Sequence, residues 1–338
     1  MTTLGIVAIG RNEGTRFQQC LESFKSLKLD FTFVYVDSGS TDNSVQHAKD
    51  AGYAVVELDT SIPFTAARAR NAGVNYLKES MPALTYIQFV DGDCQMDSDW
   101  LAKAIAELNN EPSLAVVCGR RTEIKPEASL YNLLIDKEWD TPIGYAKACG
   151  GDAMYRASAY LDVNGFNDSV IAGEEPELCY RLRQAGWKIK RMDAAMTYHD
   201  AALYSFGAWW KRAERYGHAA FEGAWRYGNS AERFYVPQVR GIVLWGGILP
   251  SFVVLVALIK PPLMLVPIVL AVLQWFRLTQ YFTKTDNNPL LARKRAFLTL
   301  ICKLAEFKGG CRFIKNKLLG KKSQIIEYKG VSSEGAGK

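Results

Sequence analysis

The sequence has few of the residues that build disulfide frameworks or zinc sites. Its seven cysteines are scattered without a CxxC pair, and only three histidines occur among 338 residues. This spacing excludes a zinc finger or ribbon and indicates reduced thiols in a cytosolic protein. No basic segment or cleavage site precedes the apolar run that starts at Leu4, so no signal peptide is predicted. We therefore expect the N-terminal part of the chain to remain in the cytoplasm.

Internal repeats and low-complexity tracts are also absent before the small, polar stretch 331–338, which is predicted to be disordered. Hydrophobic residues make up 49% of the chain. A chain of this length and composition can bury a large core, which excludes a fibrous or disordered protein.

The charges are divided unevenly along the chain. Residues 1–204 hold 20 Lys and Arg against 28 Asp and Glu, whereas residues 205–338 hold 21 against 7. The basic half also contains the most apolar stretches, a combination that suits an anionic bilayer surface better than nucleic acid. We therefore expect membrane lipids, and no nucleic acid, among the partners.

Two uncharged runs, 242–259 and 263–276, are separated only by Lys260-Pro261-Pro262 and predict a helical hairpin. The first run just reaches the length of a membrane span, while the second is short and contains Pro267. Two spans, a re-entrant hairpin and a buried hairpin of a soluble domain all remain possible. Basic residues on both flanks favour the cytoplasmic face of the inner membrane for both outer ends. We predict that residues 205–330 form basic amphipathic helices plus this membrane-associated hairpin, at about 242–276.

Strands and helices alternate in the first half of the chain. Apolar runs at 4–9, 31–36, 54–58 and 86–90 predict strands, and helical spacing follows three of them. This order predicts an α/β domain over 1–204 with a mostly parallel sheet flanked by helices. Such sheets bind ligands beyond the carboxyl ends of their strands, where three polar clusters occur here.

Asp91-Gly92-Asp93 is the most informative of these clusters because it directly follows the apolar strand 86–90. Two carboxylates at this spacing can share a divalent cation that is bound to a diphosphate. An ordinary polar turn that precedes the next helix is the alternative.

A second acidic cluster, Gly173-Glu174-Glu175-Pro176-Glu177, opens a predicted helix. Acidic residues are stabilising at a helix N-terminus, which by itself would explain them. Transfer of a group to a hydroxyl also requires a base, and a carboxylate can serve as one.

Taken together and in order, the motifs resemble those of the inverting family 2 glycosyltransferases of the GT-A fold, over roughly residues 4–200. The resemblance is carried by Ile9-Gly10-Arg11-Asn12-Glu13, Val36-Asp37-Ser38-Gly39-Ser40-Thr41-Asp42, Ala69-Arg70-Asn71-Ala72-Gly73, Asp91-Gly92-Asp93, Gly150-Gly151-Asp152-Ala153-Met154-Tyr155-Arg156, Asn164-Gly165-Phe166 and the Glu174-Glu175 cluster with Arg181-Leu182 and Gly186-Trp187.

The resemblance implies a role for each matched position. Donor binding falls to Arg11, Glu13, Asp37, Arg70, Asp91, Gly92 and Asp93, and the acceptor side to Gly151, Asp152 and Glu174. Asp91, Asp93 and His199 are the implied metal ligands, with Mn²⁺ or Mg²⁺ as the ion. Glu175 is the implied catalytic base, although it stands where the family usually has Asp, so its geometry differs.

The sequence therefore predicts metal-dependent, inverting transfer of a sugar from a nucleotide diphosphate, with UDP favoured on family grounds. A membrane hairpin favours the hydroxyl of a lipid-linked saccharide as acceptor, in the synthesis of surface polysaccharide. A polyprenyl-phosphate sugar synthase, which uses a lipid phosphate and needs no base, is the closest alternative. A non-catalytic membrane scaffold with the same fold is the alternative from another class of protein.

Overall fold

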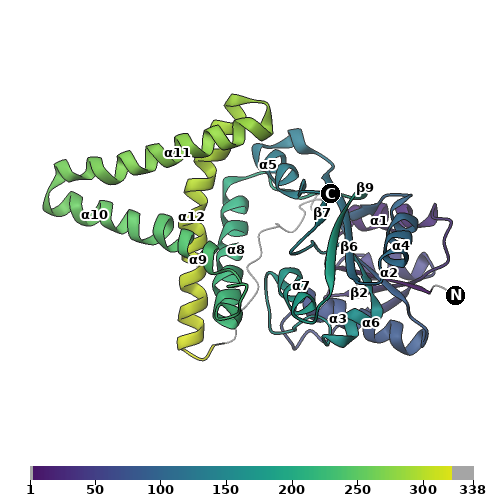
Figure 1. Ribbon diagram of the computed structural model, residues 1–338. Helices are drawn as coiled ribbons and strands as arrows, with labels where there is room; N and C mark the ends of the chain where they lie inside the picture. The colour runs from purple at the N-terminus through teal and green to yellow at the C-terminus, as the bar shows by residue number, and fades with distance from the viewer. Residues whose placement is uncertain (1–2, 322–338) are drawn as a thin grey trace. The chain divides into compact units, whose positions relative to one another are not determined.

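The computed structural model describes residues 3–321, which form two compact units that divide between Tyr204 and Ser205 (Figure 1). We call them the N-terminal unit and the C-terminal unit. The tail 331–338, predicted to be disordered, lies outside the described residues.

One sheet of nine strands forms the centre of the N-terminal unit, in the order β3-β2-β1-β4-β8-β6-β9-β5, with β7 paired to β9. The strands are β1 (Leu4–Gly10), β2 (Thr32–Asp37), β3 (Ala54–Glu57), β4 (Tyr86–Asp91), β5 (Cys94–Met96), β6 (Leu114–Glu123), β7 (Gly144–Tyr145), β8 (Met154–Arg156) and β9 (Lys188–His199).

The sheet is parallel over its first four strands and mixed beyond them. β1 pairs in parallel with both β2 and β4, and β2 pairs in parallel with β3. β8 is antiparallel to β4 and β6, whereas β6 and β9 are parallel. The predicted α/β architecture is therefore confirmed, with short antiparallel strands added to the parallel part.

Two strands, β6 and β9, continue beyond their apolar residues, because their polar halves pair with each other. The apolar run of β6 ends at Cys118, but the strand continues to Glu123, and β9 runs from Lys188 to His199. The two strands stay paired to these ends across shifts in register near Arg120. The extension carries Arg121 and His199 to the same edge of the sheet.

Helices cover the sheet, and the residues before α3 and α7 show how local sequence starts a helix. They are α1 (Thr15–Lys25), α2 (Ser44–Asp50), α3 (Ala66–Ser80), α4 (Trp100–Asn110), α5 (Leu130–Trp139), α6 (Ala157–Asp162) and α7 (Glu174–Gln184), with a short 3₁₀ turn at Pro126–Ala128. The side chain of Thr65 accepts a hydrogen bond from the Arg68 N–H and so caps α3. Gly173, at φ 75°, precedes α7 in the left-handed region that favours glycine.

Helix α3 lies unusually close to β1. A Cβ atom at Gly73 would stand 2.3 Å from a methyl carbon of Val7, so only glycine permits this approach. Gly73 follows Arg70 by three residues and therefore shares its helical face. The close packing of α3 on β1 thus helps to set the position of Arg70 along the axis of α3, relative to the ends of the strands.

The C-terminal unit is helical. It comprises α8 (Phe206–Tyr227), α9 (Val236–Ile242), a π-helical segment η2 (Val243–Ile248), α10 (Leu249–Ile259), a 3₁₀ turn η3 (Pro261–Met264), α11 (Leu265–Asp286) and α12 (Pro289–Leu318). α12 packs along α8 and also contacts α11 and η2. Glycines form the α8–α12 contact, since a Cβ at Gly217 would stand 1.9 Å from the carbonyl oxygen of Glu306.

The predicted hairpin is present as two long apolar helical stretches, Val236–Ile259 and Pro261–Asp286. Both are long and apolar enough to cross a membrane by length and composition. Within the C-terminal unit, α10 and α11 extend away from α12 and meet at η3 (Figure 1). Most of their apolar side chains are exposed, including Leu258 at 80%. Of the three alternatives, a hairpin buried within this unit is therefore excluded.

Candidate active site

Two loops meet at the carboxyl ends of β1 and β2. The Asn12 side-chain oxygen accepts a hydrogen bond from the Thr41 N–H at 2.7 Å, and the Ser38 N–H donates to the Gly10 carbonyl at 3.0 Å. Asn12 has a φ of 56°, a conformation that asparagine tolerates better than most residues. These bonds hold the two loops as one wall.

Asp37 is the last residue of β2, and its side chain accepts hydrogen bonds from the loop that follows. One carboxylate oxygen accepts hydrogen bonds from the N–H groups of Gly39 and Ser40 at 2.9 and 2.8 Å. The other accepts from the hydroxyls of Ser40 and Tyr35 at 2.5 and 3.1 Å. The side chain is buried, so in this arrangement Asp37 shapes the loop that follows it.

Arg11 and Glu13 lie on the loop after β1, as the sequence predicted. The Arg11 guanidinium lies over the ring of Phe64, 5.0 Å from its centre. Glu13 forms an ion pair with Arg16 at 2.9 Å. Arg11 thus brings an aromatic ring and a cation together beside the loop wall, a pairing that suits a planar base and its phosphates.

The Asp91-Gly92-Asp93 turn joins β4 to β5. The Gly92 N–H donates a hydrogen bond to the Ile9 carbonyl at 2.7 Å, which ties the turn to β1. A Cβ at Gly92 would stand 3.2 Å from that same oxygen, so the turn has little room for a larger residue. Asp91 is partly exposed, whereas Asp93 is buried.

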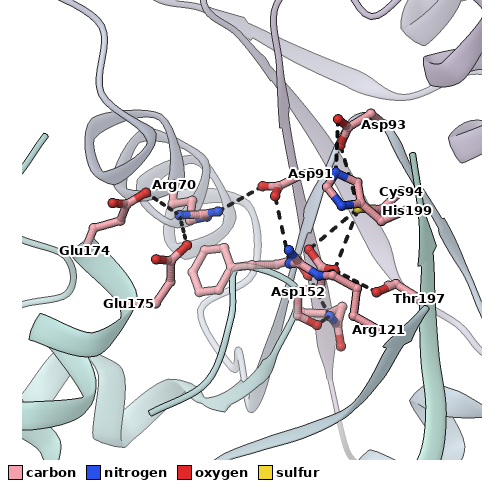
Figure 2. Close-up of polar contacts among 12 residues, drawn as sticks. Arg70, Asp91, Asp93, Cys94, Arg121, Asp152, Glu174, Glu175, Thr197 and His199 are labelled. Carbon is pink, nitrogen blue, oxygen red and sulfur yellow. Dashed lines mark hydrogen bonds and ion pairs between the residues drawn. The ribbon is translucent and has the colours of Figure 1, made fainter. Parts of the chain in front are cut away.

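Arg70 connects this turn to the second acidic cluster. Its guanidinium forms ion pairs with Asp91 at 2.9 Å, with Glu175 at 3.0 Å and with Glu174 at 3.4 Å. Figure 2 shows Arg70 between the two glutamates of α7 on one side and Asp91 on the other. Because Arg70 is only 2% exposed, this positive charge is buried among three carboxylates. Two motifs that are far apart in sequence therefore form one site.

Gly151 gives the Arg70 guanidinium its space. A Cβ at this position would stand 2.3 Å from the terminal nitrogen Nη2 of Arg70 and 3.1 Å from an oxygen of Glu175. The backbone of the Gly150-Gly151 segment thus forms part of the site wall. Gly151 lies among the predicted site residues, although it acts through its missing side chain.

The two glutamates of α7 differ in exposure. Glu174 is buried, whereas the side chain of Glu175 is 17% exposed. Burial and the neighbouring Glu174 raise the pKa of Glu175 to about 7, although Arg70 opposes the rise. A carboxyl group with this pKa can take up a proton near neutral pH, as a general base must.

Asp93 and His199 form the best candidate for a metal centre. The Asp93 Oδ2 and His199 Nε2 atoms are 3.2 Å apart (Figure 2). Two atoms that bind one ion at about 2.1 Å each and at right angles lie about 3 Å apart, so these residues fit a divalent cation. The pairing of β5 with β9 creates this contact, because it sets His199 opposite Cys94, the residue after Asp93.

Cys94 lies within reach of the same pair. Burial, together with the charges of Asp152 and Asp93, raises the pKa of the Cys94 thiol well above its ordinary value. Sulfur is a soft ligand, whereas Mn²⁺ and Mg²⁺ prefer oxygen and nitrogen ligands. Asp93 and His199 therefore supply the carboxylate and imidazole ligands of this group. Asp91, the third predicted ligand, belongs with Cys94 and Asp152 to a second group whose ligand atoms also lie within 4.8 Å of one another, and its metal role stays a prediction.

Sequence reasoning missed Arg121 and Trp139. The Arg121 guanidinium lies 4.0 Å from Asp91 and donates to Asp152 at 2.7 Å. It also lies over the ring of Trp139, 5.2 Å from its centre, and that ring is 4.9 Å from the His199 ring. The available signal was the pair of arginines directly after the apolar run 114–118, at the end of a strand of the sheet.

Asp152, which the sequence places on the acceptor side, is held by two other side chains. Its side chain is fully buried, and it accepts hydrogen bonds from Arg121 and from the Thr197 hydroxyl at 2.7 Å each. In the structure Asp152 thus contacts Arg121 and Thr197, and its predicted place on the acceptor side stays a prediction.

Two models of glycosyl transferase families match this chain. The glycosyl transferase family 2 model matches residues 6–158, and the glycosyl transferase family group 2 model matches residues 86–280, more than half of the chain. A pre-mycofactocin glycosyltransferase of Mycobacterium tuberculosis is 25% identical over 202 residues, which cover 56% of this chain and 39% of that relative. The chain thus matches less than half the length of this curated relative.

Solved structures show the same fold. The mannosyltransferase PcManGT from Pyrobaculum calidifontis, in complex with GDP-Man and Mn²⁺, has a TM-score of 0.60 at 14% identity, over 93% of this chain and 87% of that chain. TarS 1–349 of S. aureus, in complex with UDP-GlcNAc, has a TM-score of 0.54 at 13% identity, over 95% and 93%. The predicted GT-A fold is confirmed by these likenesses.

Proposed function

Because the chain belongs to glycosyl transferase family 2, we propose that it transfers a sugar from a nucleotide diphosphate to an acceptor hydroxyl, with inversion at the anomeric carbon. The observation that carries this proposal is the Arg70 bridge between Asp91 and Glu175. It joins a candidate donor site and a candidate base in one cluster of charges.

The donor occupies the loops after β1, β2 and β4 in this proposal. Arg11, Glu13 and Asp37 form the end of the donor site that receives the nucleobase. Asp91 and Gly92 lie toward the ribose and the diphosphate. UDP is the proposed nucleotide on family grounds. Support comes from the position of these loops at the carboxyl ends of neighbouring parallel strands, where α/β sheets bind their ligands.

Asp93 and His199 would hold a divalent cation, and the imidazole favours Mn²⁺ over Mg²⁺, which prefers oxygen ligands. A divalent cation held there would stabilise the negative charge that develops on a leaving diphosphate, an effect of several kcal/mol. In the structure, the Asp91 carboxylate is bound instead by Arg70, with Arg121 at 4.0 Å. Asp91 is therefore proposed as a donor contact held by arginines.

Glu175 acts as the base. Its carboxylate removes the proton of the acceptor hydroxyl as the oxygen attacks the anomeric carbon, and the bond from that carbon to the diphosphate breaks. Such base catalysis contributes about 10²–10⁴-fold to the rate. Glu175 is proposed as the base in preference to Glu174 because its side chain is more exposed. Arg70 holds the Glu175 carboxylate at 3.0 Å and balances the charge of the cluster.

The acceptor is proposed to be a lipid-linked saccharide at the cytoplasmic face of a membrane, in the synthesis of surface glycan. Support comes from the exposed apolar arms of α10 and α11 and from the basic residues that flank them. Cations next to an inserted segment favour the cytoplasmic side. The hairpin would anchor the enzyme where such acceptors are made.

The reaction is tested by release of nucleoside diphosphate from a panel of UDP- and GDP-sugars, in membranes that carry wild-type protein. We expect release from one donor that EDTA and Asp93→Ala abolish, and that Glu175→Gln lowers at least 100-fold, within the range for a lost base. Glu22→Gln, at an exposed residue of α1, serves as the matched control.

Different outcomes distinguish the alternatives. Full activity of Glu175→Gln would remove the base from the mechanism and favour a lipid phosphate acceptor. Failure of the protein to bind any nucleotide sugar in a titration would instead favour a non-catalytic scaffold.

A further inference from the structure

Helix α11 changes character abruptly at Arg277. From Leu265 to Phe276 it carries no charge, and most of its apolar side chains are exposed. Beyond that point Arg277, Gln280, Tyr281 and Lys284 follow at helical spacing, and all four are exposed. Residues three, four and seven positions apart share one face of a helix. We call this face the α11 stripe.

A hollow of about 520 Å³ lies along the stripe. Its lining comprises Arg277, Thr279, Gln280, Tyr281, Thr283 and Lys284. The lining thus offers two cations, an amide and three hydroxyl groups, and it contains no carboxylate. Most of the exposed lining is apolar, from the stems and rings of these side chains, and the Thr283 hydroxyl donates to the Thr279 carbonyl at 2.8 Å. The polar ends of the side chains of Arg277, Gln280, Tyr281 and Lys284 are groups that donate hydrogen bonds to phosphate oxygens.

The two cations of the stripe are not neutralised from within the protein. Among residues 3–321, neither Arg277 nor Lys284 lies within ion-pair distance of a carboxylate. The nearest acidic residue along the helix, Asp286, is buried and pairs with Arg295 at 2.7 Å. The charge of the stripe is therefore available to an external anion.

The position of the stripe matches the boundary of a bilayer. The apolar part of α11, twelve residues long, measures about 18 Å at 1.5 Å per residue. This length reaches well into a hydrocarbon core of about 30 Å. With the apolar part in hydrocarbon, the next turns of α11 lie among headgroups, and Tyr281 is a residue type enriched there.

The charge of the surrounding chain agrees with this placement. From Arg277 to Lys321 the sequence has 11 Lys and Arg against two acidic residues. Part of this charge lies on α12, the helix against which α11 packs. An anionic leaflet is the complementary surface.

We propose that the α11 stripe binds the phosphate groups of anionic phospholipid headgroups when the hairpin is in the bilayer. The inference rests on the membrane attachment in the proposed function and adds to it a defined headgroup site. Arg277 and Lys284 attract the phosphates, while Gln280 and Tyr281 donate hydrogen bonds to them.

The test is vesicle flotation of the full-length protein. Phosphatidylcholine vesicles are compared with vesicles in which one third of the lipid is phosphatidylglycerol. The variant is Arg277→Gln with Lys284→Gln. The matched control is Lys28→Gln with Lys78→Gln, which removes two exposed cations from the N-terminal unit.

We expect the stripe variant to bind anionic vesicles about 30-fold more weakly than wild type, from about 1 kcal/mol for each cation. Its binding to neutral vesicles should stay unchanged, as should binding of the control variant to both. Inorganic phosphate should displace the wild-type protein from anionic vesicles no better than chloride does at the same ionic strength.

Three results would overturn the headgroup site. They are equal loss in the stripe and control variants, equal loss on neutral and anionic vesicles, and specific competition by inorganic phosphate, which would indicate a site for a soluble anion. Absence of wild-type binding to any vesicle would overturn the membrane attachment as well. Release of nucleoside diphosphate in detergent measures the sugar transfer separately.

Discussion

One buried arginine connects the carboxylates of the candidate site. Arg70 pairs with Asp91, Glu174 and Glu175 and also lies over the ring of Phe166, 5.4 Å from its centre. A buried charge is stable only where it is paired, and removal of one partner leaves the others uncompensated. The carboxylates of the candidate donor site and of the candidate base are therefore coupled through Arg70, and small displacements of its guanidinium should affect both.

Gly151→Ala tests this coupling without a change of charge. The added methyl group would stand 2.3 Å from Nη2 of Arg70 and must displace it from Asp91 or Glu175. We expect kcat/KM for sugar transfer to fall about 100-fold, the size of effect that follows from a misplacement of about 1 Å. Gly150→Ala is the control, because a Cβ there would meet Arg121 at an ordinary 3.4 Å. Equal activity of the two variants would contradict the role given to Arg70.

The pH dependence of transfer follows from the pKa of Glu175, which burial and Glu174 raise to about 7. A base must be deprotonated, so kcat/KM should be level above this pKa and fall about tenfold per pH unit below it. Binding of the nucleotide sugar, titrated at the same pH values, should change much less. A flat rate profile on both sides of pH 7 would argue against Glu175 as the base.

At the scale of elements, close backbone contacts decide how the helices pack. In the N-terminal unit, Gly73 lets α3 lie on β1. In the C-terminal unit, Gly217 of α8 and Gly309 of α12 each face a backbone carbonyl of the other helix. Carbonyl oxygens of helical backbone cannot move away as side chains do, so these positions tolerate no Cβ at the present spacing.

Gly217→Ala should therefore destabilise the C-terminal unit. Its Cβ would stand 1.9 Å from the Glu306 carbonyl oxygen, and the helices must separate to admit it. We expect a loss of about 1–3 kcal/mol in the free energy of unfolding, the usual cost of overpacking. Thermal unfolding measures it, with Gly207→Ala on the same helix as control. At Gly207 the nearest atom to a Cβ would be 3.9 Å away, so that variant should be as stable as wild type or slightly more stable.

At the scale of the whole molecule, the chain combines an acidic N-terminal unit with a basic, apolar C-terminal unit. The boundary between the units falls between Tyr204 and Ser205, and the charge changes sign across it. Exposed apolar arms are costly in water, because each leucine that remains exposed forgoes about 1.5–3 kcal/mol of burial. Insertion into a bilayer would recover that free energy, and the adjoining cations would favour an anionic leaflet.

Leu255→Ser with Leu258→Ser tests the arms themselves. The two leucines are 53% and 80% exposed, so their loss should not disturb the fold. We expect vesicle binding to weaken at least 100-fold, since about 3–6 kcal/mol of apolar transfer is removed. Ile62→Ser with Ile143→Ser, which changes two exposed residues of the N-terminal unit, should bind as wild type does. Comparable binding by both variants in flotation would show that the arms lie outside the bilayer.

The sequence by itself determined the α/β class, the first four strands and the apolar hairpin. These follow from periodicity and from uninterrupted apolar runs, which act over short distances along the chain. The order of the motifs was also sufficient for the family, because polar residues at strand ends are visible without coordinates. The roles assigned to individual site residues remain predictions until the variants are measured.

Only the tertiary structure decided which of those residues meet. The contact between Asp93 and His199 depends on the register of β5 against β9, and Arg121 reaches Asp91 because β6 continues beyond its apolar run. Gly151 leaves room for the Arg70 guanidinium because it has no side chain. Asp152 is enclosed by Arg121 of β6 and Thr197 of β9. Pairing between distant strands and space around a side chain are set by the packed fold, and the local pattern of the sequence does not encode them.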